Sequence, residues 1–544
     1  MTSTNLFKFI FLVSILVDTN CTSADDVNGT IVEIETGKIR GRISKSENGN
    51  DYYSFQEIPY AAKPTGENRF QLPKSPEPWS DILNATEGTK ICYQFEPQLS
   101  STVMSEDCLY LNVYTPQKPG SDNLLPVLFW IHGGGLQSGS STLYGPKYFM
   151  DHGVVVVTIN YRLGAFGFVG TDDGVIPPNL GLKDQLFAMQ WVNRNIKAFS
   201  GNPEQVIIAG ESAGSISVGY HLTGPWVDDK QIFHGAIMQS GSALADELKL
   251  ENTTDAAFKM ALAIDPTFSS QDTKELLKFL QSANATDIVN SGVSNGVALE
   301  KNGGLISEDA YPAYLKQSYK KVPVLIGFNS EEYLFFYREN ETVLKQLDET
   351  PSKLIGTMIN MSQENRTVAG NLLKQLYTNN TSFEENVGGY IRYGSDHMFI
   401  TATCKQVELA SPDVPHYFYQ LSYKGEIAGN MTNTNTLPPG VGNVAHGEDL
   451  CYMWDLGSNS DLSQFPEQDG VMLHNIVKLW TNFVKYFDPT PEPVGNITWL
   501  PSEPSTLRYL NLNTTFEMLE HPRQYQQVKE VLETYMELPY RVFN

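Results

Sequence analysis

The stretch VIIAGESAGSISV at residues 206–218 decides the fold of this chain. It runs from an apolar, β-branched strand pattern through Gly-x-Ser-x-Gly into a sequence that favours a helix. A turn of this kind presents Ser212 on a tight bend, and Gly210 and Gly214 let neighbouring backbone pass close by. The helix that follows offers free N–H groups, which favour developing negative charge. We therefore predict that Ser212 is a nucleophile and not part of a structural glycine-rich turn.

Apolar strand-like runs alternate with longer helical patterns on either side of this stretch. The runs lie at residues 125–131, 154–159, 206–209, 233–238, 322–327 and 416–421, and helical spacing covers residues 182–196. Strands that alternate with helices predict an α/β fold with a large, mostly parallel central sheet and helices on both faces. Residues 31–60 alternate more and predict antiparallel strands at one edge. Without internal repeats or a linker, we expect a single domain over residues 24–544.

A second glycine-rich segment, His132 to Gly135, directly follows the strand-like run that ends at Ile131. Acyl transfer needs backbone N–H groups aimed at the oxyanion, each worth about 3 kcal/mol. A His-Gly-Gly-Gly loop supplies them in lipases and esterases, together with the N–H after the nucleophile, here Ala213. No Lys-Ser or Lys-Thr pair follows the glycines, which disfavours a phosphate-binding loop. We expect His132 to be structural.

The general base must come late in the chain if the order is Ser, acid, His. The candidates by position are His397, His416, His446, His474 and His521. His446 lies in a turn-rich loop, PPGVGNVAHGED, from which it can reach a serine at a strand end. His474 lies in an apolar helical pattern and is expected to be a core residue, and His397 and His416 lie on regular elements. We predict His446 as the base.

The acid must lie between Ser212 and His446. The segment GFNSEEY at residues 327–333 follows an apolar strand-like run. A carboxylate just past the end of such a strand can hold the imidazole tautomer. Glu331 and Glu332 are adjacent, so spacing alone leaves both open.

Features outside these motifs indicate a secreted protein. Lys8 and the short apolar run at residues 9–17 predict a signal peptide over residues 1–23, because the run is too short to span a bilayer. No later run is long enough either, so we expect no membrane anchor. The formal net charge of −24 disfavours nucleic acid and anionic membranes as partners.

Asparagine and cysteine usage agree with an extracellular location. N-glycans are expected, because twelve sequons occur, at Asn28, Asn84, Asn252, Asn284, Asn340, Asn360, Asn365, Asn379, Asn380, Asn430, Asn496 and Asn513. Beyond the signal peptide the cysteines are Cys92, Cys108, Cys404 and Cys451. Their even number fits an oxidising compartment. Their spacing is not that of zinc ligands, so we expect no metal site.

The chain resembles the type-B carboxylesterase and cholinesterase family of α/β-hydrolases. Within that family it is most similar in its motifs to the secreted carboxylesterases of insects. The resemblance covers nearly all of the mature chain. It is carried by the two glycine segments and by IPYA to RF (58–70), EDCLYLN (106–112), NYRLG (160–164), NLGLKDQ (179–185), QSGS (239–242) and HG (446–447).

The resemblance implies a secreted serine carboxylesterase that acts on small esters without a cofactor, through Ser212, Glu332 and His446. Glu332 is selected over Glu331 because the family acid motif resembles Gly-x-Asn-x-x-Glu-Gly, although Tyr333 replaces the last glycine. The other implied roles fall on an oxyanion hole (Gly134, Gly135, Ala213), a supporting hydroxyl (Ser240), two ion pairs (Arg162 with Asp184, Arg69 with Glu106) and a disulfide (Cys92 with Cys108). Parity further predicts a pair of Cys404 with Cys451, although cholinesterases do not pair theirs there.

Departures from the family pattern narrow the range of expected substrates. The loop from Cys92 to Cys108 has no tryptophan, so the choline-binding cation–π site of cholinesterases is missing there. Asp246 and Glu247 replace a Pro-Trp pair that lines the acyl pocket in relatives, which predicts an altered, roomier acyl site. Glu211 stands where juvenile hormone esterases typically have Gln. The alternatives are a non-catalytic adhesion protein on the same fold and a lipase.

Overall fold

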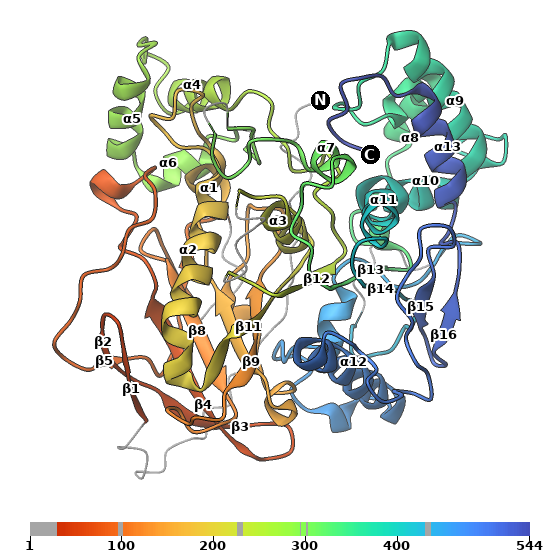
Figure 1. Cartoon of the computed structure of the whole chain (residues 1–544). Coiled ribbons are helices and arrows are strands. Elements are labelled where there is room, and N and C mark those ends of the chain that lie inside the picture. Colours follow the sequence, from red (N-terminus) through yellow and green to blue (C-terminus); the bar gives the residue numbers. More distant parts are fainter. Residues whose placement is uncertain (1–29, 96–101, 226–231, 294, 301–302, 430–436) are drawn as a thin grey trace.

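The computed structural model describes residues 30–95, 102–225, 232–293, 295–300, 303–429 and 437–544 (Figure 1). The predicted signal peptide and the sequons Asn28 and Asn430 lie outside these residues. Within the described part of the chain, no helix is long and apolar enough to cross a membrane.

The core is an eleven-stranded sheet in the order β16-β15-β14-β13-β12-β11-β9-β10-β8-β4-β3. From β10 to β15 the neighbouring strands are parallel, and antiparallel strands complete both edges. The strands are β3 (Arg42–Lys45), β4 (Asp51–Pro59), β8 (Tyr110–Thr115), β9 (Leu125–Ile131), β10 (Val155–Ile159), β11 (Gly201–Glu211), β12 (Gly235–Gln239), β13 (Val324–Asn329), β14 (His416–Leu421), β15 (Tyr509–Leu512) and β16 (Glu517–Leu519).

The central strands are apolar throughout because the sheet is buried on both faces. In β9, Val127 and Phe129 join one hydrophobic cluster, whereas Leu128 and Trp130 join another on the opposite face. The first cluster includes residues of α2 (Leu180–Asn195), α3 (Ala213–Leu222) and α11 (Thr401–Ala410), and the second includes residues of α12 (Glu467–Tyr486). Figure 1 shows α12 on the opposite side of the sheet from α2 and α3.

The remaining helices surround the upper part of the molecule as drawn in Figure 1. They are α1 (Gly164–Phe168), α4 (Thr253–Ile264), α5 (Thr273–Ser282), α6 (Ala285–Asn290), α7 (Ala310–Leu315), α8 (Glu341–Glu349), α9 (Gln363–Thr378), α10 (Val387–Ser395) and α13 (Tyr525–Tyr535). Helices α4, α5 and α6 form a satellite hydrophobic cluster together with α1.

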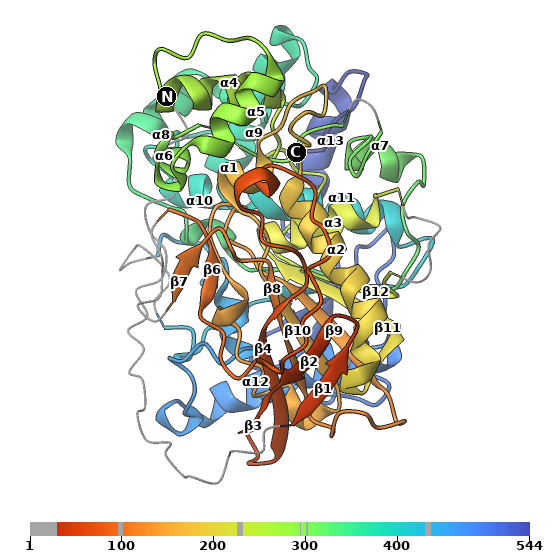
Figure 2. The same ribbon diagram turned by 90° about the vertical axis from the view of Figure 1, so that its left-hand side faces the viewer.

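The predicted fold class is confirmed. The runs at residues 125–131 and 416–421 coincide with β9 and β14, and the pattern at 182–196 forms α2. The edge prediction is confirmed for β3 and β4, but β1 (Ile31–Ile34) and β2 (Gly37–Arg40) form a separate small sheet with β5 (Leu83–Asn84). A third sheet contains β6 (Lys90–Cys92) and β7 (Val103–Ser105), which Figure 2 shows apart from β1 and β2.

The cysteines follow the prediction in one pair and contradict it in the other. Cys92 and Cys108 form a disulfide with an S–S distance of 2.01 Å. Cys404 and Cys451 are both free and buried, so their predicted pairing is wrong. The reason is topological: Cys404 belongs to the hydrophobic cluster on one face of the large sheet, and Cys451 belongs to the cluster on the other. Parity of cysteines carries no information about which side of a sheet each one occupies.

Candidate active site

Ser212 lies at the sharp turn between β11 and α3. Its backbone has φ 57° and ψ −124°, an unfavourable conformation for a residue with a side chain. Its N–H donates to the carbonyl of Gln239 on the next strand at 2.9 Å. A Cβ on Gly214 would lie 2.1 Å from the carbonyl oxygen of Ile131, so only glycine lets α3 start this close to β9. Packing of the helix against the strand therefore fixes the strained turn.

The predicted oxyanion loop runs beside this turn. A Cβ on Gly133 would meet the carbonyl oxygen of Glu211 at 2.7 Å and the Cβ of Ser212 at 3.0 Å. Gly134 and Gly135 follow with positive φ angles of 102° and 63°. The loop is thus brought to the side of Ser212, and Ala213 contributes the first N–H of α3. The glycine loop and the start of α3 thus both lie next to Ser212.

His132, the first residue of this loop, has a buried side chain. Its ring is buried, stacks on Tyr161 with 4.4 Å between ring centroids, and has Nδ1 2.8 Å from the carbonyl oxygen of Gly133. Burial lowers the pKa of His132 to about 4, so the ring is neutral at physiological pH. These contacts agree with the structural role expected for it.

Glu332 and His446 meet although 114 positions separate them. The Nδ1 atom of His446 lies 2.7 Å from Oε2 of Glu332. The other carboxylate oxygen, Oε1, accepts hydrogen bonds from the Ser240 hydroxyl and from the Asn329 N–H, both at 2.6 Å. Each oxygen of the buried carboxylate therefore has a partner, and the orientation of the imidazole is fixed.

The opposite edge of the imidazole faces the turn that carries Ser212. Its Nε2 lies 3.2 Å from Oε1 of Glu211, the residue before Ser212. Burial raises the pKa of Glu211. Burial also lowers the pKa of His446, but the charge of Glu211 and the hydrogen bond that the imidazole donates to the Glu332 carboxylate outweigh it, so that this pKa is raised. Glu211 thus lies next to the base. It belongs to the Gly-x-Ser-x-Gly motif, but from the sequence it served only to compare the chain with juvenile hormone esterases.

Aromatic rings enclose the same imidazole. Phe399 stacks on His446 at 4.4 Å between centroids, and Phe336 and Phe335 lie at 5.2 and 6.1 Å. Such apolar walls exclude water and strengthen the electrostatic contacts inside. No sequence motif marks Phe399, which lies in a π-helical turn, η8 (Asp396–Ile400), far along the chain from the catalytic motifs.

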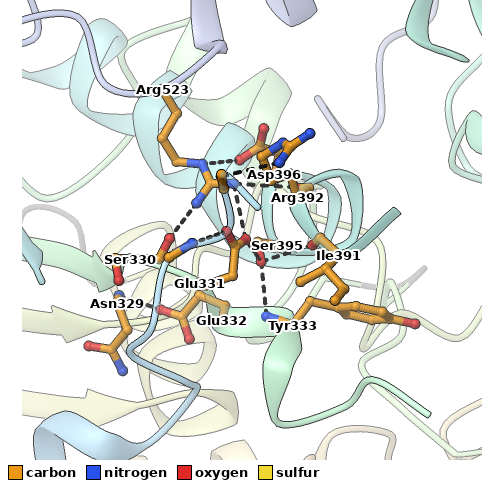
Figure 3. A network of polar contacts seen from close by, with 12 residues as sticks. Asn329, Ser330, Glu331, Glu332, Tyr333, Ile391, Arg392, Ser395, Asp396 and Arg523 are labelled. Atoms are coloured by element: carbon orange, nitrogen blue, oxygen red, sulfur yellow. Dashed lines mark hydrogen bonds and ion pairs between the residues drawn. The ribbon is translucent and has the colours of Figure 1, made fainter. Parts of the chain in front are cut away.

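The two adjacent glutamates have different partners. Glu331 points away from His446: its Oε1 accepts from Ser395 at 2.5 Å and lies 3.1 Å from the Arg523 guanidinium, and its Oε2 accepts from the Gly442 N–H at 2.9 Å. Arg523 also contacts Asp396 at 2.7 Å. Figure 3 shows Arg523 between the two acids, with Glu332 on the far side of Glu331. The contacts thus agree with the choice of Glu332 as the acid.

The departure at Tyr333 is accommodated locally. The N–H of Tyr333 donates to the Ser395 hydroxyl at 3.0 Å, and the phenol lies 3.0 Å from that of Tyr390. A Cβ on Gly394 would meet the Tyr333 ring at 2.4 Å. Glycine at position 394 thus leaves the space that the tyrosine ring fills, and the acid turn keeps Glu332 directed at His446.

A second carboxylate supports the loop that carries His446. The carboxylate of Asp449 accepts from the Gln239 amide at 2.6 Å and from the Asn329 amide at 3.2 Å. The Asn329 amide also donates to the carbonyl of Ala445 at 2.9 Å. The loop is thereby attached to the ends of β12 and β13, which keeps His446 in place.

The remaining histidines do not reach this site. His416 is buried on β14 with Nδ1 2.9 Å from the carbonyl oxygen of Val414, and His521 is exposed. His474 is exposed on α12, so its prediction as a core residue is wrong, because it lies on the solvent side of an amphipathic helix. His397 stacks on Tyr393. Of the five late histidines, His446 alone is in contact with the predicted acid.

The two ion pairs implied by the resemblance are present. Arg162 and Asp184 form a buried, two-pronged pair with both contacts at 2.7 Å. Arg69 and Glu106 pair in the same way at 2.7 and 2.6 Å. Paired, multiply hydrogen-bonded charges of this kind are tolerated inside a protein and fix the geometry of the loops that they join.

A mostly parallel sheet with a strained serine between strand and helix, a glycine loop beside it and a late histidine defines an α/β-hydrolase. The chain matches the model of the carboxylesterase family over residues 28–530. It therefore belongs to that family, and it is a carboxylic ester hydrolase.

Individual relatives agree with this assignment. Juvenile hormone esterase of Tribolium castaneum is 32% identical, with 91% of this chain and 89% of the relative covered. Esterase FE4 of Myzus persicae is also 32% identical, at 91% and 90% coverage. The crystal structure of juvenile hormone esterase from Manduca sexta, with OTFP covalently attached, superposes with a TM-score of 0.82 at 26% identity, covering 93% of this chain and 99% of that one.

Proposed function

We propose that this protein is a secreted serine carboxylesterase whose triad is Ser212, His446 and Glu332. The observation that carries the proposal is the 2.7 Å contact of Glu332 with Nδ1 of His446, whose Nε2 edge faces the turn holding Ser212. Ser212 and Glu332 follow the ends of β11 and β13, and His446 lies in the loop before η9 (Glu448–Tyr452). The chain order Ser, acid, His is that of an α/β-hydrolase.

In the proposed reaction, Nε2 of His446 takes the proton of the Ser212 hydroxyl while the oxygen attacks the ester carbonyl carbon. The tetrahedral intermediate collapses as His446 returns the proton to the departing alcohol. Water then attacks the acyl-enzyme by the same proton path and releases the acid. Glu332 stays ionised and stabilises the imidazolium through Nδ1.

The backbone N–H groups of Gly134, Gly135 and Ala213 would hold the oxyanion. Ser240 would support the triad from behind by donating to Glu332. No step of this reaction requires a metal or an organic cofactor. That a member of the family carries a covalently attached compound is consistent with a covalent route.

Organophosphate labelling tests the proposal. The secreted protein is expected to be labelled on Ser212 and to hydrolyse short p-nitrophenyl esters, and both signals should vanish in Ser212→Ala. Ser215→Ala is the matched control, because that hydroxyl lies three positions on and donates to the carbonyl of Gly241. Absence of labelling and turnover in the wild-type protein would favour a non-catalytic adhesion protein instead.

Acyl-chain length separates an esterase from a lipase. We expect activity on dissolved short-chain esters without activation by an emulsion, and the panel includes juvenile hormone because relatives bear its name. Glu211 in place of Gln leads us to expect that this substrate is not preferred. A rate that rises sharply at an oil–water interface would support a lipase.

Secretion and glycosylation form a separate part of the proposal. We infer cleavage of a signal peptide near residues 21–24, a single catalytic domain over residues 24–544, and N-glycans on several sequons. N-terminal sequencing of the protein from culture medium, and a mass shift on treatment with an amidase that removes N-glycans, test these points. Retention of residues 1–20 in the released protein would contradict them.

A further inference from the structure

A second group of titratable side chains includes Asp246 and Glu247, the two acids at the positions of the acyl-pocket pair of relatives, and it shares no residue with the Ser212, His446 and Glu332 set. Asp246 and Glu247 follow β12, and His397 belongs to the π-helical turn η8 between α10 and α11. Each of the three offers one ligand atom, and these atoms all lie within 4.8 Å of one another. All three residues are partly exposed, although the carboxylate oxygens of Glu247 are themselves buried. The fold thus joins two carboxylates and an imidazole that are far apart in sequence.

Glu247 is the unusual member of the group. Both of its carboxylate oxygens are buried and accept no hydrogen bond from another residue. A buried carboxylate without partners is costly and is normally paired, protonated or bound to a metal. The Glu247 carboxylate thus lacks a partner, which a bound cation could supply.

The cations nearby are engaged with other groups. Lys249 is hydrogen-bonded to Asp309 at 2.5 Å. The Arg366 guanidinium donates to backbone carbonyls, among them those of Gly356 at 2.9 Å and Ile359 at 2.7 Å. Among the hydrogen bonds of the described residues, the Asp246 carboxylate accepts only a long one, 3.3 Å, from the N–H of Met358. Neither cation serves as a counterion held on Glu247.

His397 is held in an orientation that suits a ligand. Its ring stacks on Tyr393 with 5.3 Å between centroids and an interplanar angle of 11°. Such support restricts the imidazole and lowers the entropy lost when a metal binds. One imidazole nitrogen with two carboxylate oxygens is a donor set that Zn²⁺ accepts, with water as a fourth ligand, whereas Ca²⁺ and Mg²⁺ prefer oxygen alone.

We propose that Asp246, Glu247 and His397 bind one divalent transition-metal ion of the Zn²⁺ type. The ion supplies the positive charge that Glu247 lacks. It connects the segment after β12 with the turn η8, which also carries the Phe399 ring stacked on His446. Its role is structural: it joins two segments beside the catalytic site and takes no part in ester hydrolysis.

Zinc titration of the full secreted protein tests the site. After treatment with a chelator, calorimetry with Zn²⁺ is expected to saturate at one ion per chain, and Zn²⁺ should raise the melting temperature. Glu247→Gln, Asp246→Asn and His397→Gln should each weaken binding about tenfold or more and abolish most of the thermal shift. Co²⁺ bound to the wild-type protein should give the absorption of a four-coordinate ion, which His397→Gln should alter.

The control is His474→Gln, which removes an exposed histidine from α12 and should leave binding unchanged. Glu247→Gln replaces an unpaired charge by a neutral amide of the same shape, so it is expected to fold. If Glu247→Gln fails to fold, Zn²⁺ binding by the His397→Gln variant, whose substituted residue is partly exposed, tests the site instead. Absence of saturable Zn²⁺ binding, or binding that survives both substitutions, would overturn the proposal. Since the readout is binding, it is independent of the triad.

Discussion

Two pairs of adjacent acidic residues follow neighbouring parallel strands, and they differ in the partners of their carboxylates. After β13, Glu331 and Glu332 are buried and every oxygen has a partner in a hydroxyl, an N–H, an imidazole or a guanidinium. After β12, Asp246 and Glu247 meet His397, but the Glu247 oxygens accept nothing from another residue. Residues of the chain supply all partners of the first pair, whereas the second pair needs the proposed cation as a partner.

The difference shows that burial and position at a strand end do not give an acid its role. What matters is how many fixed donors the surrounding fold supplies. Glu332 has them and can orient a base, whereas Glu247 lacks them, which makes it a candidate ligand. Four substitutions examine this contrast, from the largest expected effect to the smallest.

Glu332→Gln should lower kcat by about 10⁴-fold, because an amide can neither fix the tautomer of His446 nor stabilise its cation. Glu331→Gln, one position away, should leave kcat nearly unchanged, since it contacts Arg523 and not His446. Both are measured with p-nitrophenyl esters on folded, purified protein. Equal losses in the two variants would contradict the division of roles.

Glu331→Gln should act on stability instead. It removes one of the two carboxylates that face Arg523 but leaves the one on Asp396. We expect a loss of about 2 kcal/mol in the free energy of unfolding, less than for a buried charge left with no partner. The midpoint of urea unfolding measures it, with the exposed Glu349→Gln on α8 as a control. An unchanged midpoint would show that the network in Figure 3 adds nothing to stability.

Glu211→Gln should shift the pH dependence of catalysis. The Glu211 charge raises the pKa of His446, so its removal lowers that pKa and leaves the base unprotonated at lower pH. The acidic limb of kcat/KM against pH should therefore move down by about one pH unit. A limb that stays in place or moves up would mean that the 3.2 Å contact has no electrostatic effect on the base.

Glu247→Gln should stabilise the metal-free protein by about 1 kcal/mol at neutral pH. The pKa of Glu247 is raised in the folded state. The stability of the wild-type protein is therefore highest below the unfolded-state pKa of 4.5, where Glu247 is protonated in both states, and it falls as the pH rises toward the folded-state pKa. The melting temperature of the variant should thus exceed that of the wild type by a margin that grows as the pH rises above 5. A constant difference would contradict an unpaired carboxylate.

Much of the fold was predictable because its signals are local. The apolar runs that form β9 and β14 are continuous over a few residues, and the helical spacing of α2 is strong. The separation of β1 and β2 from the large sheet was not predictable, because alternation reports one buried face and not which sheet supplies it. The predicted disulfide between Cys404 and Cys451 was wrong because an even number of cysteines says nothing about the distance between them.

The chain by itself determined the strained turn at Ser212 and the glycine loop, because a tight turn and a close backbone approach demand glycine at fixed spacing. It also narrowed the base and the acid to a few residues. Only the tertiary structure joined Glu332 to His446, placed Glu211 and Phe399 around the imidazole, and gathered Asp246, Glu247 and His397. These contacts bring together residues far apart in sequence, and their geometry depends on which strand ends and turns pack side by side.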